Sequence, residues 1–118
     1  MTLTLLIVDD HDEFRRFMVS ELGHDGFDVA GEAVDGESAL DAADRLRPDV
    51  VLLDVQLPGI DGFEVARRLA ASAHPPTVVL TSSRMASDYG HSVEDAPIRG
   101  FIPKQELSAS ALSAVLAA

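Results

Sequence analysis

Short, mostly apolar segments recur five times along the chain, and longer segments with a helical pattern separate them. The short segments are partly β-branched and almost lack charged residues. Uninterrupted apolar runs of this kind are typical of strands that are covered on both faces, as in parallel sheets. The pattern therefore predicts five strands, at residues 3–8, within 27–34, at 50–53, at 77–81, and at 100–102 with Ile98 before them.

The intervening segments carry apolar residues at the spacing of amphipathic helices. Their ends are marked by glycines after the first helix, by Pro48 after the second and by Pro75-Pro76 after the third. A fourth helix is expected from residue 85 to about 94, although several Ser residues and Gly90 weaken it and Pro97 ends it. The apolar positions of the other four helices are Phe14, Phe17, Met18 and Leu22; Ala39, Leu40, Ala43 and Leu46; Phe63, Ala66, Leu69 and Ala70; and Leu107, Ala111, Leu112 and Val115.

Strand and helix thus alternate five times within 118 residues, the size of one domain. This rhythm predicts an α/β fold with a doubly wound parallel sheet and helices on both faces. The flavodoxin-like strand order 2-1-3-4-5 is a common form of this fold. Ligands of such folds bind beyond the carboxyl ends of the strands, so we expect the functional residues there.

Composition excludes several classes of protein and site. The chain has no cysteine, which rules out disulfides and thiolate metal sites, and its four histidines show no ligand spacing. A formal net charge of −11 argues against nucleic-acid binding by this segment. No apolar run approaches the roughly 20 residues that span a bilayer. We therefore expect a soluble, cytoplasmic protein with cations or basic partners.

Acidic residues follow two of the predicted strands. Asp9 and Asp10 come directly after the first strand, and Asp54 ends the third. Strands 1 and 3 are neighbours in the expected order, so the three carboxylates should converge, and an oxygen-only cluster favours a hard cation such as Mg²⁺. A structural alternative exists for Asp9, which could cap the helix that follows it. Asp12 and Glu13 need no site, because acids are favoured at helix N-termini.

The ends of the last two strands add a hydroxyl and a cation. Thr81 ends the fourth strand and is followed by Ser82 and Ser83, while Lys104 follows the fifth. Each of these residues alone is ordinary surface. Together with a metal and a carboxylate nucleophile, however, they are the parts that phosphoryl transfer needs, since its catalysis is mostly positioning and neutralisation of charge.

The sequence resembles the receiver domain of bacterial two-component response regulators over essentially all of residues 1–118. The resemblance rests on a combination of motifs: the pair Asp9-Asp10, Asp54 within LLDVQLPGIDG, Thr81 within VVLTSS, and Phe101 with Lys104 within GFIPK. It implies a single receiver domain, with any effector domain lying beyond residue 118.

The resemblance also implies a phosphorylation-activated switch. Asp54 would accept a phosphoryl group from a histidine kinase, a phosphotransfer protein or acetyl phosphate. Mg²⁺, with Mn²⁺ as an alternative, would be bound by Asp10, Asp54 and the carbonyl of Gln56, and partly through water by Asp9. Lys104, the Thr81 hydroxyl and the amides of Gln56 and Ser82 would contact the phosphoryl group.

In this family the residue corresponding to Thr81 moves toward the phosphoryl group, and the aromatic residue corresponding to Phe101 fills the vacated space. The surface of helix 4, strand 5 and helix 5 then changes, and a homodimer can form. Phe101 could equally be a core aromatic in the resting state. Many receivers have a proline after the lysine, but Gln105 stands there, which puts a cis peptide bond in doubt.

The phrases DVAGEAVDGESAL and GFIPKQELS are most similar to receivers that precede a LuxR-type DNA-binding domain, which implies transcriptional output. A stand-alone receiver or phosphorelay protein is the alternative. Two other classes are a metal-dependent phosphatase with an aspartate nucleophile and a binding module that acts without phosphorylation. The phosphatase would need a substrate-covering cap, for which 118 residues leave no room.

Overall fold

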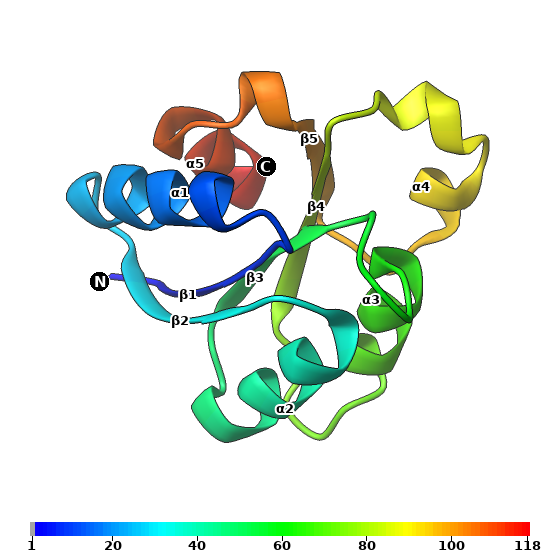
Figure 1. Cartoon of the computed structure of the whole chain (residues 1–118), viewed down its shortest axis with the longest axis horizontal. Coiled ribbons are helices and arrows are strands. Elements are labelled where there is room, and N and C mark those ends of the chain that lie inside the picture. Colours follow the sequence, from blue (N-terminus) through cyan, green and yellow to red (C-terminus); the bar gives the residue numbers. More distant parts are fainter. Residues whose placement is uncertain (1) are drawn as a thin grey trace.

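The computed structural model describes residues 2–118, and its five parallel strands lie in the order β2-β1-β3-β4-β5 (Figure 1). Both the five-stranded α/β fold and this order were predicted from the sequence and are confirmed. The strands are β1 (Thr4–Val8), β2 (Asp28–Ala33), β3 (Val50–Asp54), β4 (Thr77–Ser82) and β5 (Gly100–Pro103). The helices are α1 (Asp12–His24), α2 (Gly36–Leu46), α3 (Gly62–Ala70), α4 (Ser92–Asp95) and α5 (Ala109–Ala117), with the 3₁₀ turns η1 (Ala86–Tyr89) and η2 (Lys104–Glu106).

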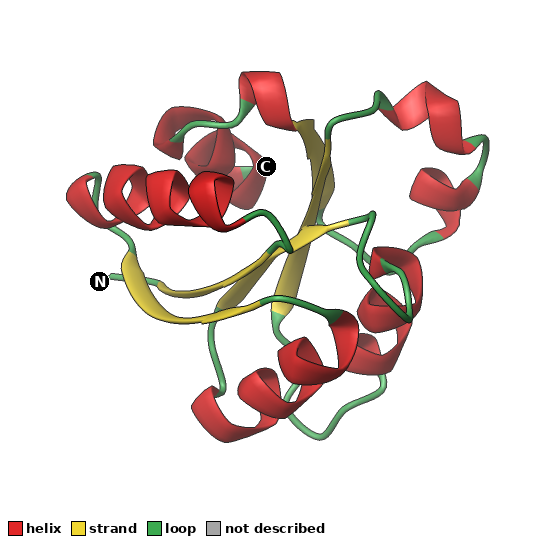
Figure 2. Ribbon diagram, viewed as in Figure 1, coloured by secondary structure: helices red, strands yellow, loops and turns green. Residues whose placement is uncertain are grey.

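The sheet lies between two layers of helices, with α1 and α5 on one face and α2 and α3 on the other (Figures 1 and 2). Side chains of a strand alternate between faces, so each strand contributes to both cores. In β1, Leu5 and Ile7 pack with the α1 and α5 layer, whereas Leu6 and Val8 pack with the α2 and α3 layer. This double burial explains why the central strands are apolar throughout.

Helix starts follow the local sequence closely. The Asp35 side chain accepts a hydrogen bond from the Ser38 amide at the start of α2, and Asp61 accepts one from the Glu64 amide at the start of α3. These are N-caps, which satisfy backbone donors that have no partner inside the helix. Helix ends were predicted less well, since α3 ends at Ala70, well before the proline pair.

The expected helix from residue 85 to about 94 is wrong as a single element. The segment instead forms the 3₁₀ turn η1 and the short helix α4. Gly90 separates them with φ +62°, a conformation that no residue inside a right-handed helix adopts. The residues that weakened the sequence pattern are therefore the ones that break the helix.

Two absences hold for residues 2–118. No peptide bond is cis, so Lys104 and Gln105 are joined by a trans bond. No helix in this range has both the length and the apolar character that crossing a bilayer requires.

Candidate functional site

The candidate site lies at the edge where the parallel strands end, which we call the carboxyl-end edge. Asp9 directly follows β1, and Asp54 is the last residue of β3. Thr81 in β4 pairs with Asp54 in the sheet register, and Lys104 directly follows β5. Residues separated by up to 95 positions therefore meet because every strand runs in the same direction.

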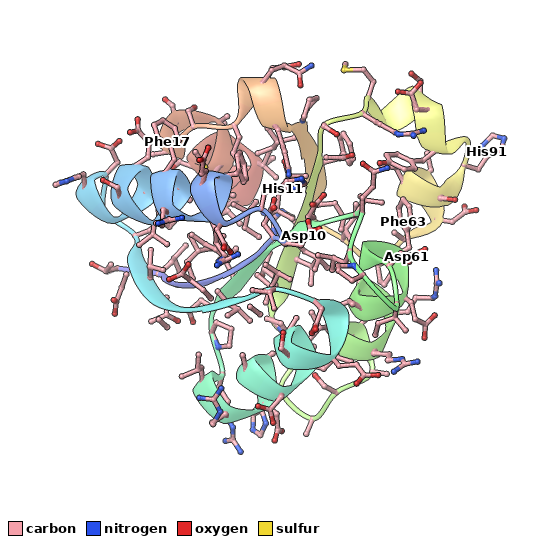
Figure 3. All side chains as sticks on the ribbon, in the orientation of Figure 1. Asp10, His11, Phe17, Asp61, Phe63 and His91 are labelled. Carbon is pink, nitrogen blue, oxygen red and sulfur yellow. The ribbon has the colours of Figure 1, made fainter. Side chains whose placement is uncertain are left out.

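Three carboxylates come together here, as the strand order required. Asp9, Asp10, Asp54 and the neighbouring His11 each offer one ligand atom, and these four atoms lie within 4.8 Å of one another. Asp9 and Asp54 are only 1% and 2% exposed. We call the three aspartates the acidic cluster; Asp10 and His11 lie on its open side, next to one another (Figure 3).

Lys104 is the cation that faces the acidic cluster. Its Nζ lies 2.7 Å from Asp9 Oδ2 and 3.4 Å from Asp54 Oδ2. The ammonium also lies 4.4 Å from the ring centroid of Phe14, a cation–π arrangement that holds the side chain over the pocket. One ammonium cannot balance three carboxylates, so the site keeps an excess of negative charge.

Asp54 has an unusual electrostatic environment for an aspartate. Its pKa is raised from 3.8 to about 6 as the net result of several effects, of which burial is the largest and the charge of Lys104, which lowers the pKa, is the next. The charge of Asp9 raises the pKa further, and the hydrogen bond from the Gln56 amide to Asp54 Oδ1, at 3.2 Å, lowers it. Ionised Asp54 is therefore costly in the absence of an additional cation.

The hydroxyl groups at the end of β4 are engaged elsewhere. Thr81 is 1% exposed, and its hydroxyl donates to the Ile102 carbonyl of β5 at 2.7 Å. The Ser82 hydroxyl lies 2.6 Å from the Tyr89 hydroxyl and accepts a hydrogen bond from the Arg84 amide. In this state neither side chain is directed to Asp54 by a hydrogen bond.

Phe101 is half-buried and belongs to an aromatic row with Tyr89 and Phe63. The rings of Phe101 and Tyr89 are 6.3 Å apart and those of Tyr89 and Phe63 are 5.4 Å apart, both edge to face. Phe101 is thus at the border of the core rather than inside it. Tyr89 was not singled out from the sequence, because only the fold brings it beside Ser82.

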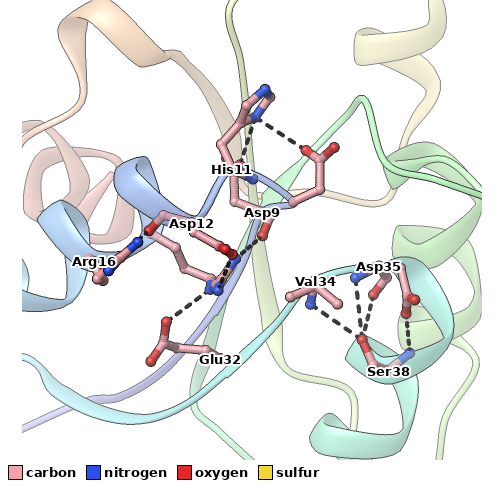
Figure 4. A network of polar contacts seen from close by, with 10 residues as sticks. Asp9, His11, Asp12, Arg16, Glu32, Val34, Asp35 and Ser38 are labelled. Atoms are coloured by element: carbon pink, nitrogen blue, oxygen red, sulfur yellow. Dashed lines mark hydrogen bonds and ion pairs between the residues drawn. The ribbon is translucent and has the colours of Figure 1, made fainter.

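A second residue that the sequence did not single out is Arg15 in α1. It is 13% exposed and donates to the Asp9 carbonyl at 2.8 Å, to Asp12 at 2.7 Å and to Glu32 of β2 at 2.9 Å. Figure 4 labels these three partners, which lie close together. The bond from Arg15 lowers the pKa of Asp12. Arg15 therefore fixes the backbone of the loop that carries Asp9 and Asp10 at the edge of the sheet.

The structure does not support helix capping by Asp9. The residue that caps α1 is His11, and its side chain makes no capping bond. Asp9 Oδ1 accepts from the His11 amide at 2.8 Å and lies 3.2 Å from His11 Nδ1. His11 itself was missed, because a lone histidine after an acidic pair has no recognisable ligand spacing.

The donor set fits a divalent cation. Asp9 Oδ2 is a fully buried oxygen that, within residues 2–118, has no hydrogen-bond donor of suitable geometry, although it forms the close ion pair with Lys104. The other atoms of the acidic cluster that could bind a metal are also carboxylate oxygens, which suit hard cations. Beside the cluster, an open pocket of about 660 Å³ is lined by His11, Asp12, Glu13, Phe14, Arg16, Ser83 and Lys104.

Residues 5–116 match the family model of the response regulator receiver domain. Over 94 residues the chain is 47% identical to protein-glutamate methylesterase/protein-glutamine glutaminase 6 of Anaeromyxobacter dehalogenans, covering 79% of the chain and 27% of that protein. It is 28% identical over 116 residues to the DNA-binding transcriptional activator EvgA of Escherichia coli strain K12, covering 98% of the chain and 57% of EvgA.

A solved structure is similar over nearly the whole chain. The signal receiver domain of the response regulator NarL from Mycobacterium tuberculosis superposes with a TM-score of 0.86 at 30% identity, covering 99% of this chain and 98% of that one. The curated relatives are longer: the chain spans 27% of the methylesterase and 57% of EvgA.

Proposed function

Since the chain belongs to the response regulator receiver domain family, we propose that it is a signalling switch that is phosphorylated on Asp54. The observation that supports this most directly is the geometry around Asp54. It is a buried carboxylate at the end of a central strand, 3.4 Å from Lys104 and within a cluster of two further acids. A raised pKa, burial and a specific cationic partner together are typical of reactive groups.

The phosphodonor is the phosphohistidine of a sensor histidine kinase or of a phosphotransfer protein, or acetyl phosphate. A carboxylate oxygen of Asp54 attacks the phosphorus, and the bond from phosphorus to the donor breaks, which is the P–N bond of a phosphohistidine or the P–O bond of acetyl phosphate. The bonding electron pair stays on the imidazole nitrogen or on the acetate oxygen, and an aspartyl phosphate forms. Lys104, which lies 3.4 Å from Asp54, also lines the open pocket, so the donor would approach Asp54 from this side.

Asp10, Asp54 and the Gln56 carbonyl would hold Mg²⁺, or Mn²⁺ in its place, with Asp9 contributing partly through water. A bound divalent ion supplies positive charge for the equatorial oxygens of the transferred group. Lys104 would pair with the phosphoryl group. The amides of Gln56 and Ser82 and the Thr81 hydroxyl would donate to it; the Gln56 amide already donates to Asp54 Oδ1.

In the proposed activation, the Thr81 hydroxyl exchanges one hydrogen-bond partner for another. For Thr81 to reach the phosphoryl group, its hydroxyl must leave the Ile102 carbonyl, which it contacts at 2.7 Å. The space that Thr81 leaves would then admit the ring of Phe101, which is half-buried before this change. The surface of α4, β5 and α5 changes with it, which couples local chemistry to a distant partner.

The output proposed is transcription, through a DNA-binding domain beyond residue 118 and a homodimer that forms on phosphorylation, in the cytoplasm. The similarity to EvgA, a DNA-binding transcriptional activator, along nearly the whole chain supports the transcriptional output. The acidic receiver segment, with its net charge of −11, would itself contact neither DNA nor membrane. Sequencing the natural reading frame past residue 118 tests the output, and a frame that ends there would leave the stand-alone receiver or relay.

Phosphorylation is tested by incubating the chain with acetyl phosphate and Mg²⁺ and measuring the intact mass. Wild type should gain one phosphoryl group, Asp54→Asn should gain none, and Asp44→Asn, an exposed acid on α2, should label like wild type. Equal labelling of wild type and Asp54→Asn would refute the proposal. Steady release of phosphate from small esters by wild type would favour the phosphatase alternative.

A further inference from the structure

His11 lies on the open side of the acidic cluster, where a ring nitrogen can serve as a metal ligand. Its Nδ1 lies 3.2 Å from Asp9 Oδ1 and 3.2 Å from Asp10 Oδ1, so one nitrogen contacts two different carboxylates. The imidazole is 69% exposed, and therefore burial does not hold it there. Its backbone is fixed at the start of α1 by the amide bond to Asp9, and its ring contacts the two carboxylates.

These separations are typical of ligand atoms that bind the same metal ion. Two ligands at about 2.2 Å from a metal and at right angles to each other lie about 3.1 Å apart, and opposite ligands lie about 4.4 Å apart. The two contacts of His11 fit the first value, and the 4.8 Å limit on all four donors admits the second. An octahedral ion could use the nitrogen without a large displacement.

Asp9 leaves this side of the cluster free for an ion. Its Oδ2 is directed to Lys104 at 2.7 Å, whereas its Oδ1 is directed to the backbone amide and ring of His11. The ammonium and the imidazole therefore contact different oxygens of one carboxylate. A cation held among the ligand atoms of Asp9, Asp10, His11 and Asp54 would therefore not need the Asp9 oxygen that Lys104 contacts.

We infer that His11 is a nitrogen ligand of the cation site and makes this receiver prefer later first-row transition-metal dications such as Ni²⁺ more strongly than its carboxylates alone would. Imidazole suits the later transition metals, and carboxylate oxygens suit Mg²⁺. This inference rests on the proposed function, because it needs a cation in the acidic cluster. It adds that His11 determines which cation is held.

His91 provides a matched control within the same chain. Its Nδ1 also lies 3.2 Å from a carboxylate, that of Glu94, and both side chains are exposed. His11 lies beside the carboxylates of Asp9, Asp10 and Asp54. His91 instead contacts the single carboxylate of Glu94 within one helical turn. A histidine–acid contact alone should therefore not create a metal preference.

The test is isothermal titration of the untagged chain with Mg²⁺, Mn²⁺ and Ni²⁺ at one pH, for wild type, His11→Gln and His91→Gln. His11→Gln should lose affinity for Ni²⁺ by about tenfold or more, lose less for Mn²⁺, and keep Mg²⁺ affinity within about twofold. His91→Gln should match wild type for all three. Echo-detected electron spin resonance of bound Mn²⁺ should show a directly bound nitrogen that His11→Gln removes.

Two results would overturn the inference. One is a Ni²⁺ affinity that does not change in His11→Gln, and the other is an equal loss for Ni²⁺ and Mg²⁺, which would make His11 an orienting group for the carboxylates. Both leave Mg²⁺ binding by wild type intact. Failure of the proposed cation site is a different result, namely wild type that binds no Mg²⁺ or binds it equally after Asp10→Asn.

Discussion

Replacement of Asp54 by asparagine should stabilise the metal-free protein, and the gain should grow with pH. Asp54 is 2% exposed, and its pKa is raised from 3.8 to about 6, chiefly by burial. A raised pKa means that the folded state holds the proton more tightly than the unfolded state. The contribution of Asp54 to the free energy of unfolding is therefore highest below pH 3.8 and falls as the pH rises through about 6.

The size of the effect follows from the difference between the two pKa values. About two units correspond to about 3 kcal/mol once the pH is well above 6, and about half of this is already lost at pH 5. Asparagine has no charge to lose. Its other effects, such as the altered contact with Lys104, are nearly the same at both pH values and cancel when the two are compared. The advantage of Asp54→Asn should therefore grow by about 1.4 kcal/mol between pH 5 and pH 8.

The measurement is urea unfolding with a metal chelator at pH 5 and pH 8, followed by circular dichroism because the chain has no tryptophan. The control is Asp44→Asn, which removes the same charge from an exposed position on α2 and should show no such growth. An advantage that is constant with pH, or that shrinks toward pH 8, would show that burial of the Asp54 carboxylate is not what destabilises the resting protein.

Three further predictions concern the pocket and the core. Lys104→Gln should move the pKa of Asp54 above about 6, because the ammonium holds it down, and a carboxyl NMR titration without metal would contradict this by an unchanged midpoint. Leu112→Ala should cost about 2–5 kcal/mol in urea unfolding, since the side chain is 0% exposed; a cost below about 1 kcal/mol would mean that α5 repacks. Gly62→Ala should destabilise by about 1–3 kcal/mol, because its Cβ would lie 2.5 Å from the Asp54 carbonyl oxygen. Gly23→Ala, whose Cβ meets nothing within 4 Å, should instead stabilise α1, and the same unfolding assay would refute the argument if both changes had the same sign.

The main features of the fold could be predicted because they depend on patterns that repeat along the chain. Apolar runs identify strands that are buried on both faces, and the parallel direction of the strands then brings their ends together. Asp9, Asp54 and Lys104 were placed at one edge by this reasoning alone, and the structure brings them within ion-pair distance. Their chemical roles remain proposals that the labelling experiment tests.

The features that were missed depend on side-chain geometry between elements. Arg15 meets Glu32 only because α1 packs beside β2, and Tyr89 meets Ser82 only because η1 folds back onto β4. Neither pair has a spacing that local propensity could reveal. The helix predicted after β4 was wrong for another reason. The weak apolar pattern of this segment could not show that Gly90 would divide it into two short elements.

The Arg15 contacts also set a condition on how related sequences can diverge. The same guanidinium holds the Asp9 carbonyl and the Glu32 carboxylate, which lies on the outermost strand of the sheet. A change at residue 32 would remove one partner of Arg15. The loop that carries Asp9 and Asp10 would then be held less firmly, although residue 32 itself lies outside the pocket. Positions 15 and 32 should therefore be replaced together during evolution, and lineages that lose one should have lost the other.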